Sequence, residues 1–209
     1  MDILAQLFGS VLRVKLMRLF LFNNENAFGL SEISKRVKTP SGEVRKELTR
    51  LISASIVKKR SVVREIHSRK SANPSVHKIH ELGYSLDQKF PYLSALKTLL
   101  ITVSLHADDS LMKKFTNIGR IKLLIASGVF IQEWDTRVDL LVVGDDLSMN
   151  RVETVMKSIE SEVGKEISYS AFETEDFEYR LGIHDRLIRD ILDSSHTVLI
   201  DKIGLETNK

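Results

Sequence analysis

The sequence predicts an α+β protein with two domains, residues 1–90 and residues 91–209, on three observations. The chain has 209 residues, more than most single domains contain. Its first part shows helical spacing of apolar residues and then two strand-like runs, whereas its second part alternates strands with helices. The charge is also divided. Residues 1–90 hold 17 Lys and Arg against 8 Asp and Glu, a formal charge of +9, and the remainder holds 14 against 20, a formal charge of −6.

Composition excludes several classes of protein. Hydrophobic residues make up 43% and charged residues 28%, which is typical of a folded chain rather than a disordered one. The absence of cysteine excludes a disulfide framework, a thiolate zinc site and a cysteine nucleophile. No run approaches the roughly 18 apolar residues of a membrane span, and the start, MDILAQLFGS, lacks the basic region of a signal peptide. We therefore expect a cytoplasmic protein with no membrane partner.

Three helices are expected in the first part. Residues 2–22 predict one amphipathic helix, because their apolar residues recur mostly at spacings of three and four. Ser31 is expected to cap a short second helix, residues 31–37. Thr39 is expected to cap the third helix, residues 40–54, which begins on a proline whose missing amide costs nothing at that position.

The third predicted helix has two different faces. Its apolar stripe is made of Val44, Leu48, Leu51 and Ile52. Its opposite side is polar and basic, with Arg45, Lys46, Thr49 and Arg50. Two short helices joined by a tight turn, the second apolar on one side and basic on the other, are typical of a helix-turn-helix.

Two strand-like runs follow and predict a basic hairpin. IVKKRSVVREI and VHKIHELGYSL are rich in β-branched or alternating residues, and the polar segment HSRKSANPS separates them. Only Glu65 and Glu81 oppose the cations of this hairpin. The cations are Lys58, Lys59, Arg60, Arg64, Arg69, Lys70 and Lys78. A phosphate backbone would meet several of them, and such binding would weaken steeply as salt rises.

The segment LSEISKRVKTPSGEVRKELTRLISASIVKK resembles the core of bacterial and archaeal winged helix-turn-helix transcription regulators, and the resemblance covers about residues 3–90. It implies a recognition helix that approaches the major groove of double-stranded DNA with Ser41, Gly42, Glu43, Arg45, Lys46 and Thr49. Charge adds Arg50, Lys59, Arg60, Arg64, Arg69 and Lys70 to this expected DNA-binding surface. Arg45 and Lys46 either read guanine edges or hold phosphates.

One position departs from that family, because Ala54 and Ser55 stand where these regulators often have a glycine between helix and strand. An alternative to DNA binding also stays open. In it the basic stripe is a solvated face on a winged helix that contacts other proteins.

The second part predicts a layered fold of strands and helices. PYLSALKTLLITVS predicts an apolar helix that links the domains or pairs with a second copy, and we expect a homodimer. IKLLIASGVFI and VDLLVVGDD predict strands covered on both faces, because they are almost continuously apolar. A helix at 149–163, a strand in GKEISYSAF, one or two helices in EDFEYRLGIHDRLIRDILDSS and a strand in SHTVLID complete the pattern.

This order of elements is similar to the small nucleotidyltransferases. In that family a Gly-Ser turn cradles a triphosphate, and an Asp-x-Asp pair holds Mg²⁺ together with a third carboxylate. Here Ser127 and Gly128 stand in place of Gly-Ser, Arg137 takes the position of the first aspartate, and Asp139 that of the second. The position expected for the third carboxylate, in the run GKEISYSAF, holds Ser or Tyr. The resemblance therefore implies a nucleotidyltransferase-like domain without catalytic residues, metal or cofactor, used for dimerisation or ligand sensing.

Several alternatives stay open for Arg137 and Asp139, which we expect on one face of a strand. They form a structural ion pair, or Arg137 holds the phosphate of a nucleotide effector in a ligand site with Asp139 and the Ser127–Gly128 turn. In a further alternative Glu133 or Asp135 rebuilds the carboxylate cluster. The chain is then an active nucleotidyltransferase that uses the winged helix to bind its substrate. The last alternative is a non-catalytic protein whose partner is another chain.

Overall fold

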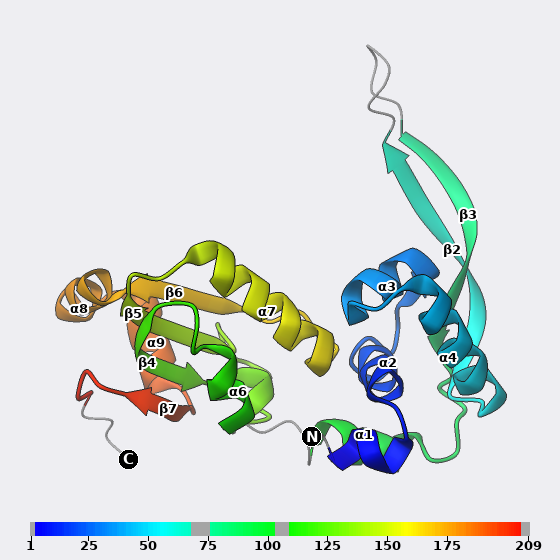
Figure 1. Ribbon diagram of the computed structural model, residues 1–209, viewed down its shortest axis with the longest axis horizontal. Helices are drawn as coiled ribbons and strands as arrows, with labels where there is room; N and C mark the ends of the chain where they lie inside the picture. The colour runs from blue at the N-terminus through cyan, green and yellow to red at the C-terminus, as the bar shows by residue number, and fades with distance from the viewer. Residues whose placement is uncertain (1–2, 68–75, 103–108, 206–209) are drawn as a thin grey trace. The chain divides into compact units, whose positions relative to one another are not determined.

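The computed structural model describes residues 3–67, 76–102 and 109–205, and it confirms the α+β class. The chain forms two compact units. Unit 1 comprises Met1–Leu100 and Ser161–Lys165, and unit 2 comprises Ile101–Glu160 and Glu166–Lys209. Each unit contains one sheet (Figure 1).

Unit 1 packs helices against a small antiparallel sheet. Its elements are α1 Ile3–Phe8, α2 Val11–Phe22, β1 Ala27–Gly29, α3 Leu30–Val37, α4 Ser41–Ser53, β2 Val57–His67, β3 Val76–Leu86 and α5 Leu93–Lys97. A π-helical turn, Thr98–Thr102, follows and contains the boundary between the units. The strand order is β1-β3-β2, and both pairings are antiparallel. The hairpin of β2 and β3 extends beyond the helices of this unit (Figure 1). The predicted third helix and hairpin therefore form at nearly the predicted bounds.

The expectation of one helix over residues 2–22 is wrong. The helix is interrupted at Gly9, whose φ is 71°. A second helix, α2, then begins after its own N-cap residue, Ser10. The Ser10 side chain accepts a hydrogen bond from the backbone N–H of Arg13 at 3.2 Å, which satisfies an amide that a helix start would otherwise leave unpaired. Gly followed by Ser is therefore a helix boundary, although the apolar spacing continues across it.

The two other predicted caps are also wrong. Gly29 precedes α3, with no side-chain cap, so Ser31 lies inside the first turn. The Thr39 hydroxyl donates to the backbone oxygen of Val37 at 3.2 Å, and α4 starts after Pro40. Both helices depend on packing rather than on capping, because their apolar faces are buried in the core of unit 1.

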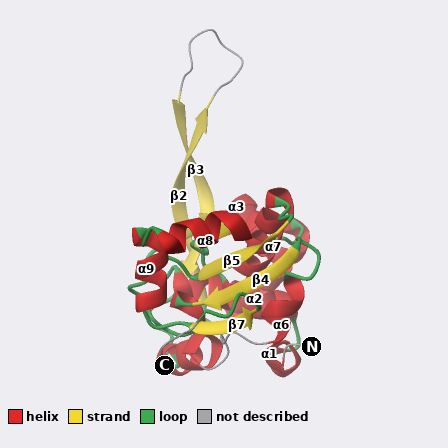
Figure 2. Ribbon diagram, turned by 90° about the vertical axis from the view of Figure 1, so that its left-hand side faces the viewer, coloured by secondary structure: helices red, strands yellow, loops and turns green. Residues whose placement is uncertain are grey.

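Unit 2 is a four-stranded sheet covered on both faces. Its elements are α6 Asp109–Lys114, β4 Arg120–Ala126, a 3₁₀ turn Gly128–Phe130, β5 Leu140–Asp145, α7 Met149–Val163, β6 Tyr169–Glu173, α8 Thr174–Gly182, α9 Arg186–Asp193 and β7 Thr197–Asp201. The strand order is β6-β5-β4-β7, in which β5 and β6 are parallel and the other pairs antiparallel. The helix α9 lies on one side of the sheet, and α6 and α7 lie on the other (Figure 2).

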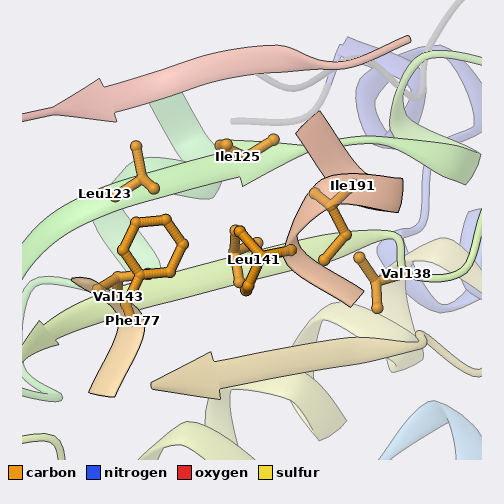
Figure 3. Close-up of a cluster of buried hydrophobic side chains, with 8 residues drawn as sticks. Leu123, Ile125, Val138, Leu141, Val143, Phe177 and Ile191 are labelled. Carbon is orange, nitrogen blue, oxygen red and sulfur yellow. The ribbon is translucent and has the colours of Figure 1, made fainter. Parts of the chain in front are cut away.

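Alternate residues of the central strands build the core of unit 2. Leu123 and Ile125 of β4 and Leu141 and Val143 of β5 point to one face, where Phe177 of α8 packs on them (Figure 3). Side chains of α9 complete this cluster, and the opposite face of the same strands is buried as well. Burial on both faces explains why these strands lack the polar alternation of a half-exposed sheet.

Candidate nucleic-acid interface

The helix α4 is held by its apolar stripe and exposes its basic side. Val44, Leu48 and Leu51 are buried, whereas Ile52 is only partly buried. Arg45 and Lys46 project from the opposite side and are exposed. Because the buried stripe fixes the rotation of the helix about its axis, the basic side faces solvent as a defined surface.

The end of α4 joins it directly to the hairpin. The N–H of Ser55 donates to the oxygen of Ile52 at 2.9 Å, and that of Ile56 donates to the oxygen of Leu51 at 3.0 Å, which together make a Schellman motif. Ser55 has a φ of 58°, in the left-handed region. This is the position at which winged helix regulators often have glycine, so the serine adopts the backbone conformation that glycine favours.

A buried carboxylate fixes α4 to α2. Glu47 is only 4% exposed, and its side chain forms an ion pair with Arg13 of α2. Its second oxygen lies 2.9 Å from the guanidinium of Arg50. Sequence reasoning missed this cluster, although Glu47 falls within the stripe of Val44 and Leu51 and could have been found there by its helical position.

Four of the seven predicted residues of α4 lie beyond its first turn, and they differ in the bonds that they already make. Within the described ranges, Arg45 and Lys46 make no ion pair. Arg50 is bound to Glu47, and the Thr49 hydroxyl donates to the backbone oxygen of Arg45 at 3.0 Å. The two free cations are therefore the strongest candidates for contact with an anion.

The first turn of α4 adds three exposed positions, Ser41, Gly42 and Glu43. Nothing lies within 4 Å of the place that a Cβ on Gly42 would take. The surface at this end of the helix is therefore open to a partner.

The hairpin carries cations on both of its faces. Lys59 pairs across the strands with Tyr84, and Arg60 with Gly83. Because successive residues of a strand point to opposite faces, Lys59 and Arg60 lie on different faces, and both are exposed. Within the described part of the chain neither forms an ion pair.

Some of the other predicted hairpin cations lie within the described residues and some lie outside them. Lys58 lies 3.4 Å from the carboxylate of Asp87. The pKa of Asp87 is lowered, first by the backbone N–H of Lys89 and then by Lys58. Arg64 lies in β2 opposite Ile79, and Arg69 and Lys70 lie outside the described residues.

In unit 2, Asp139 organises the turn that follows β4. This carboxylate is 4% exposed and accepts hydrogen bonds from the backbone N–H groups of Val129 and Ser168, at 2.9 and 3.0 Å. The φ of Gly128 is 56°, and a Cβ at this position would lie 2.1 Å from Oδ1 of Asp139. The Ser127 hydroxyl donates to the oxygen of Ser195 at 3.2 Å. Three of the four predicted ligand-site residues therefore lie together, because the N–H of Ser127 also donates to the backbone oxygen of Asp139 at 2.9 Å and Gly128 lies against the Asp139 carboxylate.

The expected placement of Arg137 is wrong. The strand β5 begins at Leu140, so Arg137 and Asp139 precede it and share no strand face. Arg137 pairs with Asp190 of α9 at 2.8 Å, and it makes no ion pair with Asp139. Asp190 is distant in sequence, and no local pattern pointed to it.

The carboxylates Glu133 and Asp135 are exposed in the loop before β5. Among the residues that the structure describes, no group of three His, Cys, Asp or Glu side chains is placed to hold a metal ion. None of the described helices is both long enough and apolar enough to cross a membrane.

Comparison of the chain with protein-family models, with curated proteins and with solved structures found no match. The resemblances to winged helix regulators and to nucleotidyltransferases therefore remain predictions.

Proposed function

We propose that the chain is a transcription regulator of the winged helix-turn-helix type, which binds double-stranded DNA through α4 and the β2–β3 hairpin. The observation that carries this proposal is the set of exposed cations on these two adjoining elements that form no ion pair with any residue that the structure describes. Arg45 and Lys46 stand on α4, and Lys59 and Arg60 stand on the hairpin. Cations without carboxylate partners are available to neutralise phosphates.

The contacts that hold α4 within unit 1 support its role as the recognition helix. An α-helix is about 10–12 Å across with its side chains, which matches the roughly 12 Å width of the major groove of B-DNA. Its inner face is buried, Glu47 bonds it to α2, and its C-terminal motif leads straight into β2. Helix and hairpin therefore meet a duplex as one preformed surface.

For unit 2 we propose a nucleotidyltransferase-like domain that is catalytically silent and serves dimerisation or ligand sensing. Asp139 supports the proposed lack of catalytic activity, because both oxygens of this carboxylate accept hydrogen bonds from backbone N–H groups. The nearby cation Arg137 is bound to Asp190. No observation favours the alternative of an active nucleotidyltransferase.

The test of this function is a fluorescence anisotropy titration of the full chain with duplex DNA containing a site selected from random sequence. Arg45→Ala is expected to lose about 1–3 kcal/mol on the selected site if the guanidinium reads a base edge, and much less on unrelated duplex. Equal weakening on both duplexes would assign Arg45 to phosphate contact.

Arg189→Ala is the matched control, because it removes an exposed arginine from α9 in unit 2. Its affinity for both duplexes is expected to equal that of the wild type. Undetectable duplex binding by the wild-type chain, or identical affinities for Arg45→Ala and the control, would refute the proposed interface.

A further inference from the structure

A cavity opens at the edge of the sheet of unit 2, where α6 faces β4 and the edge strand β7. Its volume is about 380 Å³, within the range of roughly 300–1,000 Å³ that small-molecule sites occupy. Its apolar lining includes Met112 and Phe115 of α6, Ile121 of β4 and Ile200 of β7. These side chains offer an uncharged wall to an apolar ligand.

The polar lining of the cavity is cationic. Arg120, Lys122 and Lys202 line it beside the hydroxyl of Thr116, and no carboxylate of the described residues does. The N–H of Lys202 donates to the backbone oxygen of Lys122 at 2.7 Å, so the two lysines lie opposite one another just past the end of β7. Like charges directly opposite one another are destabilising, and an anion bound between them would offset the repulsion by Coulomb attraction. This arrangement stands out because residues 91–209 carry a formal charge of −6.

The three cations differ in their existing partners. Arg120 lies 2.9 Å from Asp146, and Lys122 lies 3.6 Å from Asp145. The pKa of Asp145 is lowered, first by the hydroxyl of Thr174 and then by these cations. Lys202 is exposed and, among the described residues, makes no ion pair. Lys202 is therefore the cation most available to a ligand.

We propose that this cavity binds an amphiphilic organic anion, with its carboxylate, sulfonate or phosphate group beside Lys202 and Lys122 and its apolar body against Met112 and Ile200. The site is separate from the Asp139 turn, because that turn follows the far end of β4, about 20 Å along the strand at 3.3 Å per residue. The proposal does not depend on DNA binding, and either function can fail without the other.

The experiment uses the full chain and the fluorescent anion anilinonaphthalene sulfonate, whose emission rises in an apolar site. Saturable binding is expected, and Lys202→Gln is expected to weaken it by about tenfold, because a hydrogen bond to a charged group is lost. Lys202→Arg is expected to retain the affinity. Lys113→Gln is the matched control, since it removes an exposed lysine from α6 that does not line the cavity.

A neutral analogue separates charge from apolar contact. Phenylnaphthylamine lacks the sulfonate, and its affinity is expected to be the same for the wild type and Lys202→Gln. A second control is Leu7→Ser, which removes an apolar side chain of α1 that is 67% exposed and does not line the cavity. The proposal is wrong if Lys202→Gln binds the anionic probe as tightly as the wild type, if no saturable binding occurs, or if Leu7→Ser abolishes the binding.

Discussion

Gly128→Ala is expected to destabilise unit 2 by about 3 kcal/mol or more, through two effects at one position. The φ of 56° costs about 1–2 kcal/mol for a residue with a Cβ. The Cβ would also lie 2.1 Å from Oδ1 of Asp139 and displace that carboxylate. The N–H groups of Val129 and Ser168 would then lose their acceptor, at about 1–3 kcal/mol for each buried group left unpaired.

Urea unfolding followed by the fluorescence of Trp134 measures this effect, because the single tryptophan of the chain lies in the loop before β5. Gly182→Ala is the matched control in the same unit, since nothing lies within 4 Å of its Cβ position. The control is expected to unfold like the wild type. A Gly128→Ala variant within about 0.5 kcal/mol of the control would show that Asp139 does not organise the turn.

Glu47→Ala is expected to destabilise unit 1 by about 2–3 kcal/mol. Breaking a buried ion pair typically costs about 3–5 kcal/mol, and the cost here is reduced because Arg13 and Arg50 are partly hydrated. Glu47→Met is expected to retain more stability than Glu47→Ala, since an apolar side chain of similar volume fills the same space.

Urea unfolding followed by far-ultraviolet circular dichroism measures this second change. Glu43→Ala, one turn earlier on the exposed part of α4, provides the control and is expected to stay within about 0.5 kcal/mol of the wild type. Equal stabilities of Glu47→Ala and Glu43→Ala would mean that the carboxylate does not hold α4 against α2.

Local signals predicted the elements that carry the candidate interface. The apolar stripe of α4 and the alternation of β2 and β3 are patterns within one segment, and the elements form close to their predicted bounds. The break at Gly9 was missed because the apolar spacing continues through it. There the backbone conformation of glycine and the cap at Ser10 outweigh periodicity.

The candidate site in unit 2 was less predictable, because its contacts join residues that are far apart in sequence. Asp139 binds the N–H of Ser168, and Arg137 binds Asp190. An alternating strand pattern placed Arg137 and Asp139 on one face, but β5 starts after both of them. Where a strand begins depends on its neighbours in the sheet, so a one-segment pattern does not fix it.

The salt dependence of duplex binding tests the central claim most directly. Anisotropy titrations of the full chain with a duplex of arbitrary sequence, at a series of salt concentrations, give the slope of log K against log salt. We expect a steep negative slope, of about −0.9 for each phosphate neutralised, and a slope shallower by about 1 in Lys46→Gln but not in Lys113→Gln. Absence of duplex binding, or a slope that Lys46→Gln leaves unchanged, would contradict a DNA interface on α4.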